Sequence, residues 1–299
     1  MSVQQFGRPQ DAPISCKIDI QFWQTASQIK LDKHKLDTPV ETLQGSFSAG
    51  SRSRGQGQLL LEKNAFTLGH AVEPGRCKMM GEMLLVNTSE AFKDSARNHP
   101  KILSSVYSQL AQAISSPETL HEPHKLNMFF MLVFADLKKY HYNYCMAVPF
   151  LAADDFVNIL STPQPAADVL GQDTLVKISG AVMGTESGLG NAFLLHTDGT
   201  CAPLHTMTKE FDGYVVMLDT EGAEGCHPTA IGTAHRNLLA CLTKQIERHD
   251  WKLLAFRDVF LTSEVSSENN AGKRPASMIF NIRTGTVPDL AAPGAFKAG

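Results

Sequence analysis

The segment from Leu126 to Tyr144 carries the most regular apolar pattern in this sequence of 299 residues. Spacings of four and three residues separate its apolar positions, which are Leu126, Phe130, Val133, Leu137, Tyr140 and Tyr144. Such spacing places all of them on one face of an α-helix. The pattern therefore predicts a long central helix over about residues 124–147, and Pro149 should end it.

Shorter patterns predict strands and helices before this segment. The runs QLLLEK (58–63) and EMLLVN (82–87) are typical of strands. Thr88 is suited to cap a helix that follows it, and Pro100 is suited to the start of the next one, over KILSSVYSQLAQAIS.

The second half of the chain predicts a hairpin and a crossover. Asp198-Gly199 is a typical turn between the strands of a hairpin. A strand at 214–219, a helix over about 229–248 and a strand at 252–258 form a βαβ unit, whose two strands should be parallel. The last strand is SMIFNI, which begins at Ser277.

The stretch STPQPAADVLGQD (161–173), with two prolines, is the best interior boundary. We therefore predict an α+β fold in two subdomains, each a mixed sheet with packing helices. The first spans 1–162 and holds the long helix, the second spans 163–290 and holds the crossover, and 291–299 is expected to be a linker.

Composition excludes several function classes. The formal net charge of −3 gives no basic field for nucleic acid or an anionic membrane. The apolar run MFFMLVFA (128–135) is too short to cross a bilayer, and the first twenty residues resemble no secretory signal. The six cysteines form no CxxC pair, which argues against a zinc ribbon and favours reduced thiols in the cytoplasm.

Nucleotide and metal motifs are weak. GTESGLGN (184–191) matches neither the Walker A nor the dinucleotide pattern, so a plain loop is expected and ATP binding by this chain is not. Cys226-His227 could supply two metal ligands, but no second pair stands at finger spacing. We expect a turn there and no metal site.

One catalytic alternative stays open. On a helix, His141 and Cys145 would lie one turn apart, which allows a cysteine-dependent hydrolase. A cysteine near the end of a helix and beside an aromatic stripe is more often a small packing residue, because the helix dipole disfavours a thiolate there. We expect no catalytic residue in this chain.

Four short stretches are similar to one known family, in matching order. FADLKKYHYNY closely resembles a segment of the N-terminal domain of autophagy-related protein 7, the activating enzyme for the ubiquitin-like modifiers of autophagy. IDIQFWQTASQIKLDKHKLDT resembles the opening of that domain, HRNLLACL with WKLLAFRD resembles its arginine-asparagine helix and following strand, and SMIFNI resembles its last strand. Gly232-Thr233-Ala234-His235 departs from the family pattern.

The resemblance implies a division of labour. The family's N-terminal domain recruits the conjugating enzymes, autophagy-related proteins 3 and 10. A C-terminal region, which this sequence lacks, binds ATP and magnesium, activates the modifiers (autophagy-related proteins 8 and 12) and holds the catalytic cysteine. The resemblance implies a non-catalytic recruitment domain that acts in the cytoplasm and at the pre-autophagosomal structure.

A docking domain needs a groove or a sheet edge with a few anchoring side chains. Lys138, Lys139, His141 and Tyr142 lie away from the apolar stripe, so they are candidate partner-binding residues on the surface. Phe256 and Arg257, at the end of a predicted strand, are the second choice. Either a peptide in a groove or an added strand would serve as the mode of binding.

Overall fold

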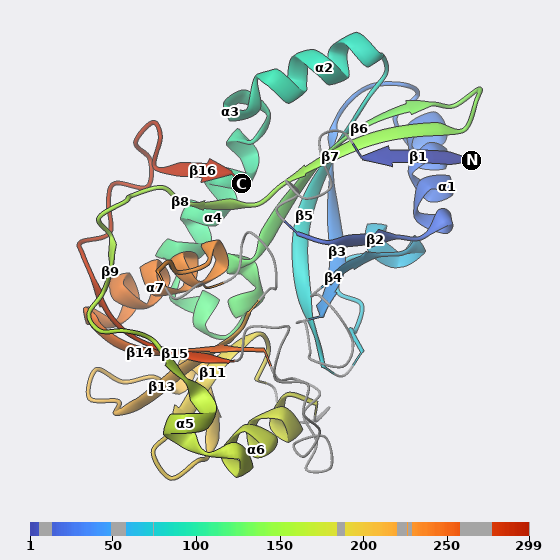
Figure 1. Ribbon diagram of the computed structural model, residues 1–299. Helices are drawn as coiled ribbons and strands as arrows, with labels where there is room; N and C mark the ends of the chain where they lie inside the picture. Colours follow the sequence, from blue (N-terminus) through green and yellow to red (C-terminus); the bar gives the residue numbers. More distant parts are fainter. Residues whose placement is uncertain are drawn as a thin grey trace.

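Two large β-sheets, with helices between them and a small two-stranded sheet beside them, form the described part of the protein in a computed structural model (Figure 1). The structure describes residues 1–5, 14–48, 58–73, 75–183, 189–219, 226, 229–257 and 277–298. Most of the glycine-rich loop at 184–191, His227 and the polar loop before Ser277 lie outside these residues.

The first sheet is built mainly from the N-terminal half of the chain. Its strands are, in spatial order, β1 (Ser2–Gln5), β7 (His141–Ala147), β6 (Met128–Asp136), β5 (Arg76–Val86), β3 (Val40–Ser48), β4 (Gln58–Leu61) and β2 (Cys16–Ile18). β5 and β6 run parallel, whereas β6 and β7 form an antiparallel hairpin.

The predicted central helix over 124–147 is wrong. Residues 123–126 form one 3₁₀ turn, and the rest is the β6–β7 hairpin. Met128 to Val133 are all buried because β6 is central in its sheet and covered on both faces. A strand of this kind shows no alternation of apolar and polar residues, so its sequence also satisfies a helical spacing.

The second sheet contains the predicted crossover. Its strand order is β10 (Gln164–Pro165), β15 (Met278–Thr284), β14 (Asp250–Phe256), β13 (Gly213–Leu218), β11 (Ala192–His196) and β12 (Cys201–Pro203), and β9 (Val157–Ile159) also pairs with β15. β13 and β14 are parallel, and the hairpin with its turn at Asp198-Gly199 is confirmed. The division of the chain at residue 162 stays a prediction.

The predicted linker at 291–299 is partly a strand. β16 (Phe296–Ala298) pairs with β8 (Pro149–Leu151), and Phe296 is buried. The ring of Phe296 stacks on Tyr107, with 5.8 Å between the ring centroids. This aromatic contact explains why the segment is held on the body of the protein.

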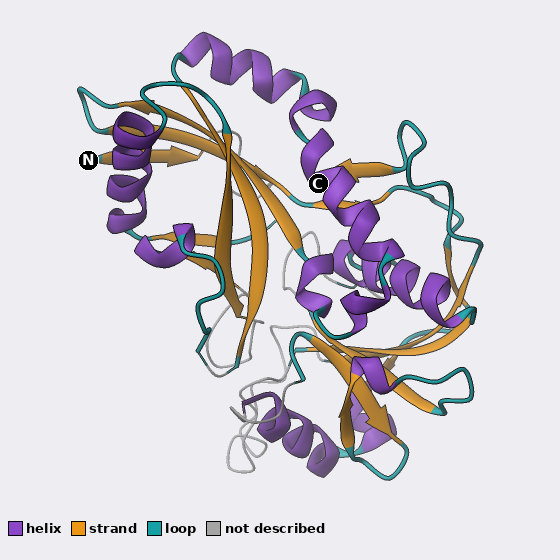
Figure 2. Ribbon diagram, turned by 180° about the vertical axis from the view of Figure 1, so that it is seen from behind, coloured by secondary structure: helices purple, strands orange, loops and turns teal. Residues whose placement is uncertain are grey.

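The helices cover both sheets. They are α1 (Ile20–Gln28) with a π-helical extension (Ile29–Lys33), α2 (Ser89–Arg97), α3 (His99–Ile102), α4 (Ser104–Ser115), α5 (Ala166–Leu170), α6 (Gln172–Met183) and α7 (Thr233–Ile246), and 3₁₀ turns span Lys63–Phe66, Pro117–Leu120, Pro123–Leu126 and Leu204–Thr206. α4 and α7 pack together between the two sheets, while α6 lies on the far side of the second sheet (Figure 2). Thr88 caps α2 as expected, since its hydroxyl accepts from the Ala91 N–H.

Two neighbouring residues of α7 join the halves of the molecule. The Asn237 side chain accepts from the Leu151 N–H at 3.0 Å and donates to the carbonyls of Leu126 and Pro149. Arg236 donates to the carbonyls of Leu151 and Ala153. Both polar residues therefore serve the fold by satisfying backbone groups between the sheets.

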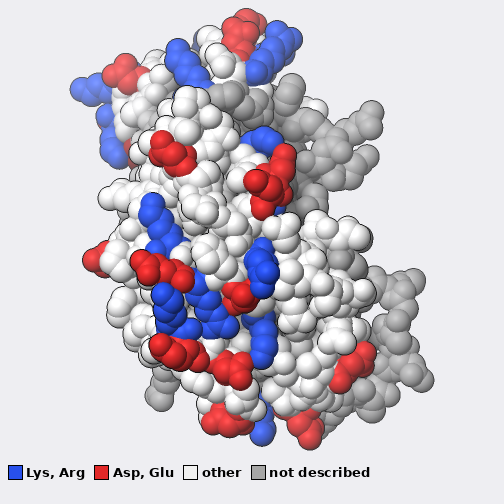
Figure 3. All heavy atoms as spheres, turned by 90° about the vertical axis from the view of Figure 1, so that its left-hand side faces the viewer, with Lys and Arg blue, Asp and Glu red and all other residues white. Residues whose placement is uncertain are grey.

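Charges are mixed on the face drawn in Figure 3, where basic and acidic groups stand side by side. Around the second sheet, Lys252 pairs with Asp212 and Arg283 with Asp250, each at 2.8 Å. In the described part of the chain, no helix is long and apolar enough to cross a membrane.

Candidate functional site

The β6–β7 hairpin ends in a tight turn that projects beyond the first sheet, at the upper right of Figure 1. Asp136 closes the turn, because its Oδ1 accepts from the N–H groups of Lys138 and Lys139, each at 3.2 Å. Tyr140 follows in the left-handed conformation with φ 50° and is 63% exposed. The structure thus places Lys138, Lys139 and Tyr140 together on the surface at the tip.

An apolar hollow of about 590 Å³ lies beside this tip. We call it the tip pocket; its walls come from three segments, Lys30, Leu31 and Leu36, then Leu85, Val86 and Asn87, and finally Phe134 to Lys138. Leu31 and Leu36 are about half exposed at its rim. Exposed leucines around an apolar hollow, with lysines at one edge, are typical of a protein-binding surface.

The wall of the tip pocket is held in an unfavourable backbone conformation. Lys35 and Leu36 have φ values of 48° and 74°, a region that costs a non-glycine residue about 1–2 kcal/mol. Asn87 secures the segment by donating to the Leu36 carbonyl at 2.7 Å. Leu36 nevertheless stays about half exposed, so its side chain contributes little to the core.

Lys30 anchors the same wall from below. Its side chain is buried, and its ammonium group donates to the Leu85 carbonyl at 2.7 Å and to the Asp37 carbonyl. Burial lowers the pKa of Lys30, while the Asp37 carboxylate acts in the opposite direction. The π-helical turn that carries Lys30 is a form found often at functional sites.

Tyr142 is a core residue, so its assignment to the surface is wrong. Its ring packs on Trp23 with 5.0 Å between centroids, and 1% of the residue is exposed. His141, the preceding residue on β7, is half-buried. Alternation along the strand explains the difference, because successive side chains point to opposite faces.

Phe256 and Arg257 are also buried, which corrects their choice as surface residues. Phe256 lies in the core at the end of β14. Arg257 donates through Nε to Oδ2 of Asp219 at 2.9 Å, and its Nη2 lies 2.7 Å from the same oxygen in an ion pair. Neither side chain can contact a partner without a rearrangement of the sheet.

His141 and Cys145 are not a catalytic pair in this geometry. Both lie on β7, and four residues of strand separate them by about 13 Å. Burial raises the pKa of the Cys145 thiol to about 11, opposite to the shift that a nucleophilic cysteine needs.

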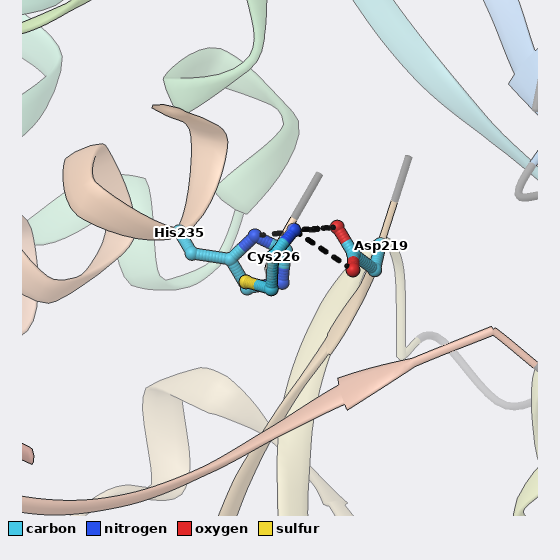
Figure 4. A group of neighbouring side chains, drawn as sticks. All are labelled: Asp219, Cys226 and His235. Atoms are coloured by element: carbon cyan, nitrogen blue, oxygen red, sulfur yellow. Dashed lines mark hydrogen bonds and ion pairs between the residues drawn. The ribbon is translucent and has the colours of Figure 1, made fainter. Parts of the chain in front are cut away.

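A buried polar cluster lies at the carboxyl ends of the parallel strands β13 and β14 of the second sheet (Figure 4). Asp219 follows β13, His235 stands in the first turn of α7, and Cys226 comes from the connection between them. The Cys226 N–H donates to both carboxylate oxygens of Asp219 at 3.1 Å. Burial, followed by the nearby Asp219 carboxylate, raises the pKa of the Cys226 thiol well above its ordinary value.

Sequence patterns pointed to Cys226 but missed its companions. Asp219 and His235 stand seven residues before it and nine residues after it, which fits no finger spacing. Only the crossover topology brings them together, because α7 begins above the end of β13. The signal available in the sequence was a polar residue directly after a buried strand of a βαβ unit.

Comparison with known proteins identifies the class to which this fold belongs. The sequence model described as "Ubiquitin-like modifier-activating enzyme ATG7 N-terminus" matches residues 10–296. The chain belongs to this family, as the sequence resemblance predicted.

Curated relatives are about 30% identical to the chain over the segments that align. A ubiquitin-like modifier-activating enzyme ATG7 from Gallus gallus is 31% identical over 218 residues, which are 72% of this chain and 29% of the relative. The human enzyme of the same name is 30% identical over 154 residues, 52% of this chain and 22% of the relative. The chain thus matches less than a third of each relative's length.

Solved structures show the same fold. The N-terminal domain of Atg7 from Kluyveromyces marxianus superposes with a TM-score of 0.62 at 19% identity, covering 99% of this chain and 94% of that one. The same domain in a complex with Atg10 gives a TM-score of 0.61 at 18% identity, covering 100% of this chain and 91% of that one. The mixed α and β architecture is therefore confirmed.

Proposed function

We propose that this chain recruits the conjugating enzymes of autophagy, autophagy-related proteins 3 and 10, to the activating enzyme. The observation that carries the proposal is membership of the family, supported by the solved complex of a similar domain with Atg10. The chain works by proximity, since holding one partner near a thioester raises its effective concentration. In this proposal, another region of a longer protein binds ATP and magnesium and activates the modifiers, autophagy-related proteins 8 and 12. The whole protein would act in the cytoplasm and at the pre-autophagosomal structure.

The tip pocket and the lysines beside it are the proposed docking surface. An apolar side chain of the partner would enter between Leu31, Leu36 and Phe134, while acidic groups beside it would face Lys138 and Lys139. Lys139 is largely exposed, and its ion pair with Asp136 is long, at 3.6 Å. Such a cation exchanges an intramolecular partner for an intermolecular one at little cost.

Binding can be tested with the purified chain and each purified conjugating enzyme by isothermal titration calorimetry. We expect association at micromolar concentrations. A chain with an intact circular dichroism spectrum that binds neither enzyme at tens of micromolar would refute recruitment.

Leu36→Gly separates docking from folding. Glycine accepts the positive φ without strain, so this variant should fold at least as stably as the original chain. Loss of the exposed side chain should weaken binding about tenfold, the effect of one buried leucine at an interface.

The Lys138→Glu/Lys139→Glu variant tests the charges, and it should weaken binding most at low salt. Leu68→Ala and Lys17→Glu/Lys63→Glu are the matched controls, because these side chains are exposed outside the tip pocket. Equal losses in the tip variants and in the controls would place the docking surface elsewhere.

A further inference from the structure

The buried cluster of Asp219, Cys226 and His235 offers three different donor atoms to one point. A carboxylate oxygen, a sulfur and an imidazole nitrogen lie within 4.8 Å of one another. All three side chains are buried, with at most 6% exposed. Mixed nitrogen, sulfur and oxygen donors in a tetrahedral arrangement are the set that zinc prefers.

The buried imidazole of His235, whose nitrogens lack hydrogen-bond partners in the described part of the chain, points to a missing ligand. His235 is 1% exposed, and among the described residues neither ring nitrogen has a hydrogen-bond partner. Its Nδ1 lies 3.8 Å from Oδ1 of Asp219, too far for a hydrogen bond. The Met217 carbonyl lies near the ring but forms no hydrogen bond of normal geometry with it.

Leaving both nitrogens unsatisfied costs about 1–3 kcal/mol for each group. A neutral imidazole with a free lone pair, buried and turned toward a carboxylate, is the form that binds a metal ion. Figure 4 shows the ring directed toward Asp219, with Cys226 beside both residues.

The carboxylate of Asp219 is already oriented for such a role. Arg257 donates to Oδ2 through Nε, and its Nη2 is ion-paired with the same oxygen at 2.7 Å and donates to the Cys226 carbonyl at 2.7 Å. Oδ1, which accepts from the Cys226 N–H, lies on the side of His235. Metal-binding carboxylates are usually held in this way by a second hydrogen-bonding group, and Arg257 also compensates the aspartate charge in the unloaded cluster.

The position in the fold fits a ligand site. Asp219 and Arg257 follow the parallel strands β13 and β14, and α7 begins above their carboxyl ends. In open α/β sheets this edge is where ligands bind. An ion here would tie the end of β13 to the start of α7.

We propose that Asp219, Cys226 and His235 bind one structural zinc ion. As the zinc–sulfur bond forms, the Cys226 thiol releases its proton to solvent, and the fourth position is open to water. Neither step changes an oxidation state. This site is separate from the tip pocket, so its test needs no conjugating enzyme.

The experiment measures zinc in the purified chain by mass spectrometry and follows cobalt binding after chelation. We expect about one zinc ion per chain and a sulfur-to-cobalt absorption band. The zinc-loaded chain should also have a higher melting temperature than the chelated one. A correctly folded chain with neither bound zinc nor a cobalt band, even with stoichiometric metal added, would overturn the proposal.

Variants assign the ligands. Cys226→Ser should abolish the sulfur-to-cobalt band and lower the zinc content at least tenfold, and His235→Gln should lower the zinc content similarly. Cys241→Ser is the matched control, because Cys241 is an equally buried free thiol in α7 outside the cluster. A band that persists in Cys226→Ser would disprove the assignment, and the metal content of the unmodified chain decides the question if variants fold poorly.

Discussion

The hydroxyl oxygen of Tyr142 lies 2.6 Å from the Oγ of Ser27, which joins β7 to α1 in the core of the first sheet. Ser27 already donates to the Trp23 carbonyl at 2.9 Å, so Tyr142 is the donor in the shared bond. A residue that the sequence placed on the surface therefore contributes to the core through both its ring and its hydroxyl.

Tyr142→Phe should lower the free energy of unfolding by about 1 kcal/mol, the net contribution of one hydrogen bond. The ring contact with Trp23 is retained in this variant. Urea denaturation measures the change, and Tyr140→Phe at the exposed tip is the control. Equal stability of the two variants would show that the hydroxyl pair contributes nothing.

Gly81→Ala should destabilise the protein by about 2–3 kcal/mol, the usual cost of overpacking a core. Gly81 on β5 is opposite Phe129 on β6, and an added Cβ would lie 2.4 Å from that fully buried ring. Gly180 is exposed on α6 with open space around its Cα. Gly180→Ala should therefore stabilise by about 0.5–1 kcal/mol, and thermal unfolding should show opposite shifts for the two variants.

Asn237→Ala should cost about 3 kcal/mol, because it leaves one backbone N–H and two carbonyls without their partner inside the protein. Gln245→Ala on the same helix removes a single bond to the Ile114 carbonyl, so its effect should be below about 1 kcal/mol. Denaturant unfolding of both variants gives the comparison. A loss at Asn237 no larger than that at Gln245 would mean that water replaces the amide.

His124 should make stability depend on pH. Burial, with the nearby Lys78 adding to it, lowers the pKa of His124 from 6.5 to about 4. Between these two pH values His124 is protonated in the unfolded chain and neutral in the folded one. The free energy of unfolding therefore falls as the pH drops from 6.5 toward 4. His124→Gln should flatten this part of the profile, and NMR should find the imidazole of the folded protein still neutral at pH 5.5.

Thiol labelling distinguishes a docking domain from a cysteine hydrolase. With its pKa raised to about 11 by burial, Cys145 should react with iodoacetamide at neutral pH far more slowly than a free thiol. Unfolding should restore normal reactivity. Rapid modification of Cys145 in the folded chain would support the hydrolase.

Sequence patterns were sufficient where one signal dominated. The Asp198-Gly199 turn and the strand–helix–strand pattern around α7 each led to the observed elements. They failed from Met128 to Ala147, because the first strand of this hairpin, β6, is buried on both faces and has no periodicity of two. The turn of that hairpin uses Asp136 and a left-handed Tyr140, without the glycine or asparagine that marks most such turns.

The surface assignment of Tyr142 suffered from the same error. On a helix, Tyr142 would point away from the apolar stripe, but strand alternation turns it inward. Lys138 and Lys139 lie on the surface under either interpretation, because they occupy the turn. The tip pocket and the cluster around His235 depend on contacts between distant segments, and the only local signal for either was the polar residue Asp219 directly after a buried strand.

β6 and β7 run without a break from the exposed turn into the middle of the first sheet, and β6 is clamped there on both faces. The hairpin is therefore rigidly connected to the core of the sheet. A protein bound at its end would therefore be held at a fixed angle to the rest of the domain. That angle is determined by the packing of β6 in the core, far from the surface that the partner touches.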